Sequence, residues 1–207
     1  MELILDVKIF IASIDEEAWI KMVLYDENFR NYACKKEGIR QFIRLFTKYM
    51  EGKTYLLGYL HSIYDEPAKI DQGNKYWYCM DKIHRENDLP AYIGLNGDKA
   101  WWSNDNHHRE NDLPALMYAN GAKQWIVGGK IHRENDLPAI IYAGGDKFWY
   151  YDGKRHREND LPAIIYAGGD KFWYYAGKRH RENDLPAIID VNGGKYWCYN
   201  GKMVYPR

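Results

Sequence analysis

The eight residues His-Arg-Glu-Asn-Asp-Leu-Pro-Ala combine groups that could do chemistry with groups that form turns. The motif begins at His84 and returns every 24 residues, at His108, His132, His156 and His180. A histidine close to two carboxylates could act as a general base with an orienting acid. Catalysis would also need a nucleophile or an oxyanion pocket, and the motif has no serine, no cysteine and no phosphate-binding glycine loop. We therefore predict a protein that is not an enzyme, with no catalytic residues and no cofactor.

The same side chains are candidate metal ligands. Zinc ligands lie about 2.1 Å from the ion, whereas equivalent histidines of neighbouring hairpins are expected about 10 Å apart, two strand spacings from each other. One ion therefore cannot join two repeats. Within one repeat, His132, Glu134 and Asp136 could hold at most a weakly bound cation, and we predict no metal site.

A structural role accounts for the same residues. Arginine and the two carboxylates of each motif can pair within a repeat and between neighbours, and asparagine and aspartate can accept hydrogen bonds from turn amides. Exposed ion pairs contribute at most about 1 kcal/mol each. We therefore interpret the motif as a fastener, and we expect aromatic residues to supply most of the stabilisation.

The 24-residue step extends well beyond the octapeptide. Six of the eight tryptophans form one column, Trp77, Trp101, Trp125, Trp149, Trp173 and Trp197. Glycines keep the same step at Gly97, Gly121, Gly145, Gly169 and Gly193. A third column contains only aspartate or glycine, at Asp81, Asp105, Gly129, Gly153, Gly177 and Gly201. A fixed period of this length is the sequence signature of a repeat architecture.

One unit of the repeat has the pattern of a β-hairpin. Residues 139–142 and 147–151 are rich in β-branched and aromatic side chains and flank Gly144 and Gly145. In other units the turn contains Asn-Gly, a pair that favours tight turns because both residues tolerate positive φ. The column of aspartate or glycine predicts a second backbone position with positive φ. Stacked units would form an antiparallel meander that advances about 10 Å per repeat.

The predicted fold is mainly β, an elongated solenoid of antiparallel β-hairpin repeats with a small α-helical N-terminal cap. We expect two domains, a helical module over residues 1–50 and a repeat array over residues 51–207. Ser13 and Glu16 have capping-box spacing before an apolar stripe. His61–Ala68 is a degraded copy of the octapeptide, and the sheet is expected to start near Lys53.

Composition restricts the classes of partner. Lys+Arg and Asp+Glu are both 29, so we expect neither a nucleic-acid nor a membrane partner. Cys34, Cys79 and Cys198 are an odd number without metal or redox spacing, which favours a reducing compartment and a cytoplasmic location. The N-terminus has no signal-peptide pattern and no run long enough to span a membrane.

Aromatic residues occupy both faces of the second predicted strand. Because side chains alternate along a strand, Trp149 and Tyr151 are expected on one face and Phe148 and Tyr150 on the other. Large aromatic patches indicate a contact surface. The tryptophan column could therefore be the core of a curled sheet, the interface of a symmetric homodimer, or a groove for another chain.

The repeat units, such as GDKFWYYDGKRHRENDLPA over residues 145–163, resemble the MORN repeat and more closely its variant in large DNA viruses of amoebae. Residues 6–47 are similar to the F-box-like segment that often precedes such repeats there. The resemblance implies that the N-terminal module docks a Skp1-type adaptor while the repeats select a target. It also implies scaffolding, homodimerisation and membrane tethering as roles of such repeats, and a host cytoplasm or virion location.

We therefore expect a non-enzymatic scaffold or adaptor for protein partners. In the helical module the residues expected to contact the partner are Trp19, Ile20 and Phe29. One alternative is a structural or virion-associated protein that forms a homodimer through the repeat sheet. Another alternative is a phospholipid-binding module that uses a column of lysines.

Overall fold

The computed structural model describes residues 47–56, 59–62 and 65–205. It divides into two compact units, Met1–His84 and Arg85–Arg207. The helical module predicted at the N-terminus lies, up to residue 46, outside the described residues. Its last four residues, Thr47–Met50, form a strand paired with Lys53–Leu56. The sheet therefore begins before Lys53, where the sequence placed its start. Among the residues that the structure describes, no helix is long and apolar enough to cross a membrane.

The described part of the first unit contains short antiparallel strands. They are β1 (Thr47–Met50), β2 (Lys53–Leu56), β3 (Tyr59–Leu60), β4 (Lys69–Asp71), β5 (Asn74–Tyr76), β6 (Tyr78–Cys79) and β7 (Lys82–Ile83). Strands β1, β2, β4 and β5 follow one another in one sheet, β3 also pairs with β2, and β6 and β7 form a separate hairpin.

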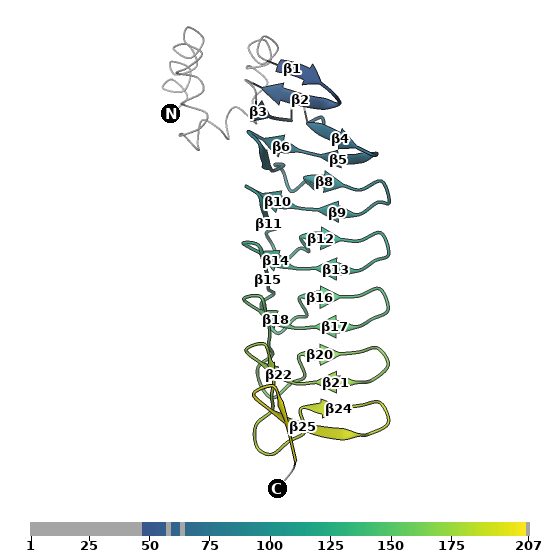
Figure 1. Cartoon of the computed structure of the whole chain (residues 1–207), viewed down its shortest axis with the longest axis vertical. Coiled ribbons are helices and arrows are strands. Elements are labelled where there is room, and N and C mark those ends of the chain that lie inside the picture. The colour runs from purple at the N-terminus through teal and green to yellow at the C-terminus, as the bar shows by residue number, and fades with distance from the viewer. Residues whose placement is uncertain (1–46, 57–58, 63–64, 206–207) are drawn as a thin grey trace, which may run out of the picture. The chain divides into compact units, whose positions relative to one another are not determined.

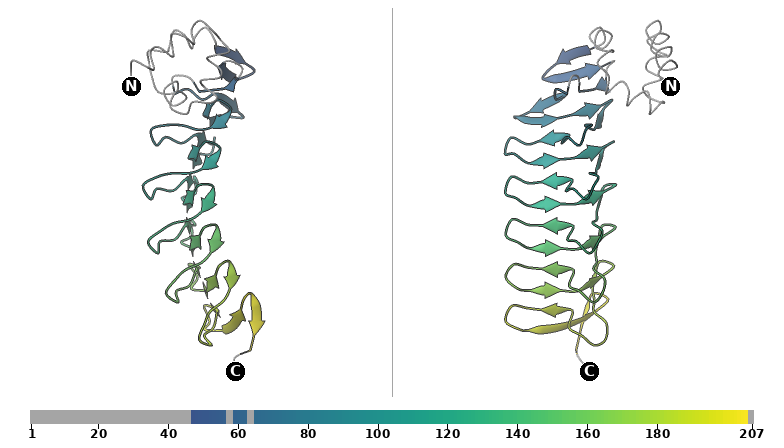
Figure 2. Two further views of the ribbon diagram at one scale, coloured as in Figure 1. Left: turned by 90° about the vertical axis from the view of Figure 1, so that its left-hand side faces the viewer. Right: turned by 180° about the vertical axis from the view of Figure 1, so that it is seen from behind.

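The second unit repeats one pattern of four short strands. Its main sheet contains β8 (Tyr92–Ile93), β9 (Lys99–Ala100), β12 (Leu116–Met117), β13 (Lys123–Gln124), β16 (Ile140–Ile141), β17 (Lys147–Phe148), β20 (Ile164–Ile165), β21 (Lys171–Phe172), β24 (Ile188–Ile189), β25 (Lys195–Tyr199) and β26 (Lys202–Val204). Its small hairpins contain β10 (Trp102–Ser103), β11 (Asn106–His107), β14 (Ile126–Val127), β15 (Lys130–Ile131), β18 (Tyr150–Tyr151), β19 (Lys154–Arg155), β22 (Tyr174–Tyr175) and β23 (Lys178–Arg179). Within this unit the hairpins lie one below another, with the main-sheet turns on one side and the small hairpins on the other (Figures 1 and 2).

In the described repeats before the last, the strand is interrupted at the tryptophan of the column, whereas β25 runs through Trp197. The sequence predicted one continuous strand over residues 147–151, but β17 ends at Phe148 and β18 starts at Tyr150. The Trp149 N–H donates to the carbonyl of Ala163 in the next repeat, while its carbonyl accepts from the His156 N–H. One residue is thus shared between two ladders, and the chain passes from the main sheet to the small hairpin. The predicted alternation fails for the same reason: Trp149 is 7% exposed, whereas Tyr151, expected on the same face, is 57% exposed.

The bend encloses a core along the tryptophan column. Trp77, Trp101, Trp125, Trp149 and Trp173 are buried. The alanine that ends the motif is 0% exposed in every copy of both units, which leaves no room there for a larger side chain. Around Trp149, the core includes Phe148, Ala163, Ile164 and Tyr174.

The main hairpin turn differs in type from the predicted one. The Tyr142 carbonyl accepts from the Gly145 N–H at 2.9 Å, and the Tyr142 N–H donates to the Asp146 carbonyl at 3.0 Å. This is a three-residue loop that ends in a left-handed glycine. In the Asn-Gly copies only the glycine has positive φ, 95° at Gly97 and 92° at Gly121. The asparagine instead accepts a hydrogen bond from the amide two residues later, as at Asn96 and Asn120.

The turn of the small hairpin and the turn within the octapeptide both contain residues with left-handed backbone. The column of aspartate or glycine has φ between 64° and 88° at all six positions, which confirms the prediction of positive φ. In the octapeptide, Asn135 and Asp136 have φ of 59° and 55°, and the Leu137 N–H donates to the Glu134 carbonyl at 3.2 Å. Asparagine and aspartate tolerate this conformation better than other non-glycine residues. This explains why Asn-Asp stands at the centre of the motif.

The neighbouring pair Gly144 and Gly145 offers a matched test of the loop. Gly145 has φ of 94°, whereas Gly144 has no positive φ and no atom within 4 Å of an added Cβ. We expect Gly145→Ala to lower the free energy of unfolding by about 1–2 kcal/mol, since an alanine is strained there. Gly144→Ala is the control and is expected to be neutral or slightly stabilising. Urea unfolding followed by circular dichroism measures both, and equal effects would contradict the assigned loop.

Candidate functional site

The motif arginine joins two consecutive octapeptides through the tryptophan between them. Nε and Nη2 of Arg157 donate to the two carboxylate oxygens of Asp136 at 2.7 and 2.8 Å. The Arg157 guanidinium carbon lies 3.9 Å from the centre of the Trp149 ring. The Trp149 indole N–H donates to the backbone carbonyl of Asp136 at 2.9 Å, and Nη1 of Arg157 donates to the Pro162 carbonyl at 3.3 Å. We call this set of aspartate, tryptophan and arginine an arginine clamp.

The second unit contains four complete arginine clamps. They are Asp88/Trp101/Arg109, Asp112/Trp125/Arg133, Asp136/Trp149/Arg157 and Asp160/Trp173/Arg181. The arginine side chains are 13–14% exposed and the aspartates 44–51%. A planar guanidinium suits both contacts, because it forms paired hydrogen bonds to a carboxylate while stacking on an aromatic face. We therefore expect each clamp to stabilise the fold more than an exposed ion pair does.

The first unit shows the same contact between a tryptophan and an aspartate carbonyl. The Trp77 indole N–H donates to the Asp65 carbonyl at 2.8 Å, as tryptophans of the second unit do to their aspartates. Ser62 stands at the arginine position of the degraded motif, and its hydroxyl accepts hydrogen bonds from the amides of Ala68 and Tyr78. Asp65 of the degraded copy thus binds a tryptophan as the aspartate of the octapeptide does.

The motif histidine forms a second link between repeats. Nδ1 of His156 accepts a hydrogen bond from the Ala176 N–H of the next small hairpin at 3.2 Å. Its Nε2 lies 2.7 Å from Oε1 of Glu158 in its own motif. Because Nδ1 accepts, the hydrogen of the neutral ring is on Nε2, where it is donated to the carboxylate. His108, His132 and His180 make the same two contacts. The histidine therefore fixes the position of the next hairpin.

Tyrosines and histidines alternate along the small hairpins. The ring of Tyr151 lies 4.9 Å from that of His132 and 6.3 Å from that of His156, in edge-on geometry. The series continues through Tyr175, His180 and Tyr199, with centroid distances of 4.9–6.2 Å. We call these six residues the His–Tyr ladder. Its tyrosines are 55–59% exposed, so the ladder presents ordered phenol rings to solvent.

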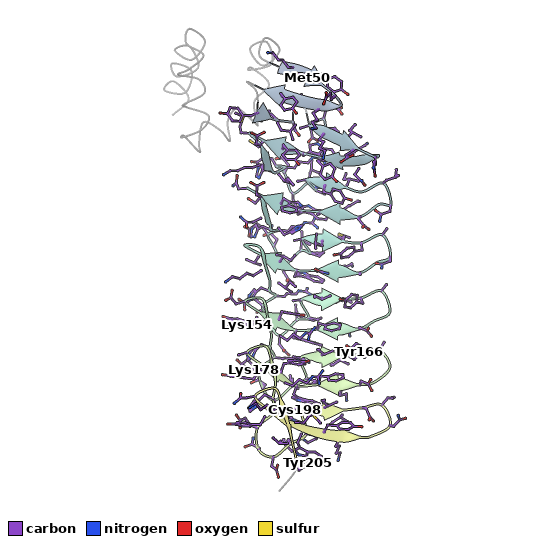
Figure 3. All side chains as sticks on the ribbon, in the orientation of Figure 1. Met50, Lys154, Tyr166, Lys178, Cys198 and Tyr205 are labelled. Atoms are coloured by element: carbon purple, nitrogen blue, oxygen red, sulfur yellow. The ribbon has the colours of Figure 1, made fainter. Side chains whose placement is uncertain are left out.

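Lysines accompany the tyrosines across the small hairpins. Tyr151 pairs with Lys154, and Tyr175 with Lys178. Directly paired residues of an antiparallel ladder point to the same face, and Figure 3 shows Lys154 and Lys178 on this side of the second unit. The surface therefore combines aromatic area with lysine ammonium groups and with the exposed Glu134, Glu158 and Glu182 carboxylates that contact the ladder histidines.

The acidic and histidine side chains of one motif do not converge. His132 contacts Glu134, whereas the carboxylate of Asp136 is bound to Arg157 of the next motif. Among the residues that the structure describes, no group of three or more His, Cys, Asp or Glu side chains could hold a metal ion.

The predicted site residues have different outcomes. Trp19, Ile20 and Phe29 lie outside the described residues. In the tryptophan column, Trp197 alone among its six members is only partly buried. Gly97, Gly121, Gly145, Gly169 and Gly193 all have positive φ, between 84° and 110°.

Sequence reasoning did not single out the His–Tyr ladder. The signal was present, because Tyr151, Tyr175 and Tyr199 keep the 24-residue step. The ladder was not recognised because a continuous strand over residues 147–151 places Tyr151 on the same face as the buried Trp149.

No protein-family model matches the sequence, and no curated protein is significantly similar to it.

The burial of the clamp predicts coupling between its charged groups. In a double-mutant cycle of Asp136→Asn and Arg157→Ala, we expect a coupling energy of about 1 kcal/mol, the upper end for partly exposed pairs. Asparagine is chosen because it tolerates the left-handed backbone of Asp136. The control is the Lys130–Asp152 pair, whose side chains are 60% and 59% exposed, for which we expect no measurable coupling. Thermal and urea unfolding provide the energies, and comparable coupling in both pairs would contradict the role assigned to burial and stacking.

The clamp also predicts a dependence on pH. Its hydrogen bonds from Arg157 hold the pKa of Asp136 below its ordinary value, against the opposing effect of burial. A carboxyl whose pKa is lowered on folding stabilises the fold above its unfolded pKa, about 3.9, and this contribution is lost as pH falls through the lowered pKa. An NMR titration of the Asp136 carboxyl should give a pKa below about 3.9, and Arg157→Gln should raise it. A titration unaffected by Arg157→Gln would contradict the assignment.

Proposed function

We propose that the protein is a non-enzymatic scaffold for protein–protein interaction, a solenoid of β-hairpin repeats that presents a partner-binding surface along its small hairpins. The observation that carries the proposal is the His–Tyr ladder. The three tyrosines of the ladder are exposed, yet each is packed against at least one histidine ring.

Ordered tyrosines suit a protein interface for two reasons. The ring contributes apolar contact area while its hydroxyl stays hydrated, so tyrosine is enriched where one chain binds another. Side chains already held in place lose less conformational entropy when they bind. The histidines of the ladder are themselves fixed by their links to the neighbouring hairpins, so this order extends from repeat to repeat.

The lysines on this surface favour acidic groups at the matching positions of a partner. Lys154 and Lys178 are exposed beside Tyr151 and Tyr175. In the earlier repeat, Lys130 is instead paired with Asp152. The surface that binds the partner is therefore expected to be centred on the later repeats, and the partner to place carboxylates beside these lysines and basic or donor groups beside the exposed Glu158 and Glu182.

The resemblance to MORN-repeat proteins with an F-box-like segment is consistent with an adaptor role. In that role the N-terminal module would bind a Skp1-type protein through Trp19, Ile20 and Phe29, while the repeats bind a second protein. This half of the proposal rests on the resemblance alone.

The test compares two sets of substitutions on exposed residues. Partners captured by the full-length chain are identified and purified, and their affinity is measured for wild type and for Tyr151→Ser/Tyr175→Ser/Tyr199→Ser. We expect the triple variant to bind at least tenfold more weakly, since exposed tyrosines at an interface core contribute most of the binding energy. Leu95→Ser/Val191→Ser is the control, because these residues are 77% and 62% exposed outside the ladder, and it should retain its affinity within about twofold.

Other outcomes would replace the proposal. A solution mass of two chains that returns to one in the triple tyrosine variant would indicate a homodimer formed through the ladder. Flotation with vesicles rich in anionic lipid, lost on Lys154→Gln/Lys178→Gln, would indicate a membrane surface instead. Equal binding of a protein partner by wild type and the triple variant would place the interface elsewhere.

A further inference from the structure

The last clamp of the described array has two of its three members. The Trp197 indole N–H donates to the Asp184 carbonyl at 2.9 Å, as inner tryptophans do to their aspartates at 2.9–3.0 Å. The 24-residue step that starts at Arg181 leads to Tyr205 instead of an arginine. Tyr205 is 95% exposed and thus does not cover the indole (Figure 3).

Among the residues that the structure describes, no arginine fills this clamp, and both other members are accessible. Trp197 is only partly buried, whereas Trp173 in the preceding complete clamp is 7% exposed. Asp184 is exposed, and within residues 47–56, 59–62 and 65–205 no side chain pairs with its carboxylate. One of the two backbone links of the inner tryptophans has a counterpart here, because Val204 pairs with Trp197 where a histidine N–H binds the carbonyl of each inner tryptophan.

We propose that Asp184 and Trp197 form a binding site for an arginine side chain presented by a protein partner. The guanidinium donates two hydrogen bonds to the Asp184 carboxylate and stacks on the Trp197 ring, as Arg181 does with Asp160 and Trp173. The inference deepens the proposed scaffold function and rests on it for the kind of ligand, a protein. The site itself rests on the four complete clamps of the same chain.

The chemistry of the site selects arginine over lysine. A lysine ammonium is a point charge, so it can neither span the two carboxylate oxygens in a parallel pair of hydrogen bonds nor stack as a plane on the indole. The rest of the motif also contributes in the inner clamps, since Nη1 of Arg181 donates to the Pro186 carbonyl five residues later. The best match is therefore an arginine followed by a turn in which a backbone carbonyl a few residues later accepts a hydrogen bond from the guanidinium.

The clamped motif arginines of a second copy are poorer occupants than a free arginine of another protein. The motif arginines Arg109, Arg133, Arg157 and Arg181 are 13–14% exposed and already bound in their own clamps. A second copy that placed one of these arginines in the site would lose one of its own clamps for the new one it forms. An arginine that is free in its own protein has no such cost.

The experiment uses the full-length chain and a defined probe, the end-blocked octapeptide His-Arg-Glu-Asn-Asp-Leu-Pro-Ala. Binding is followed by the NMR signal of the Trp197 indole N–H. We expect the peptide to shift this signal, and to bind at least tenfold more weakly when its arginine is replaced by lysine or when the chain carries Asp184→Asn, since bonds to a charged group of this kind account for at least that factor. Asp184→Asn removes no contact of the described residues, so folding is retained.

Two further variants serve as controls. Asp160→Asn changes the equivalent carboxylate in a filled clamp and should leave the peptide affinity unchanged. Tyr205→Arg supplies the missing group in the same chain, so it should raise the midpoint of thermal unfolding and prevent the peptide from binding. Tyr205→Gln is the matched substitution and should do neither.

The proposal is overturned if the lysine peptide binds as tightly as the arginine peptide. It is equally overturned if the Asp184→Asn chain binds the arginine peptide as tightly as the wild-type chain does. It is also overturned if free L-arginine binds as tightly as the peptide, or if the chain forms a dimer that Asp184→Asn dissociates, since the occupant is then not a protein partner. These outcomes are independent of the tyrosine variants. A scaffold that binds through the His–Tyr ladder can thus survive failure of the arginine site, and the reverse also holds.

Discussion

The placing of one guanidinium group between a carboxylate and an indole is the interaction on which the second unit depends. Two-residue strands contribute few backbone hydrogen bonds between neighbouring hairpins, so side-chain contacts add substantially to what fixes their relative position. Arg157 does this because it belongs to one motif, stacks on the tryptophan before it, and binds the aspartate of the preceding motif. The histidine adds a second connection on the side of the small hairpins. The octapeptide turns have the polar composition of solvated loops. Through the arginine and the histidine they nevertheless hold consecutive repeats together.

The bend at tryptophan resolves the problem of a strand that is apolar on both faces. If residues 147–151 formed one strand, a single sheet would leave half of its aromatic side chains in water. The change of direction at Trp149 places the indole inside the corner and turns Tyr151 outward. Tyrosine is suited to the outer position, because its hydroxyl remains hydrated. The same bend that builds the core thus creates the aromatic surface from which we infer function.

Much of this arrangement follows from the sequence, for identifiable reasons. The period, the hairpins and the left-handed glycines could be predicted because Gly145 and Gly153 stand at positions where few other residues are tolerated. The bend could not be predicted, since it arises from the hydrogen bonds of Trp149 to two different neighbours, and local composition does not encode these partners. The sequence also did not show which carboxylate binds Arg157. Glu158 is adjacent in the sequence, yet the bound carboxylate is that of Asp136, 21 residues earlier.

Every joint in the second unit connects residues at a nearly constant separation along the chain, 20 residues for the histidine link and 21 for the arginine–aspartate pair. The contacting surfaces of successive repeats are consequently interchangeable. A gene that gained or lost one 24-residue segment through unequal recombination would encode an array with the same joints and a different number of hairpins. The length of such an array can therefore evolve separately from its stability, and so can the distance between whatever is bound at its ends.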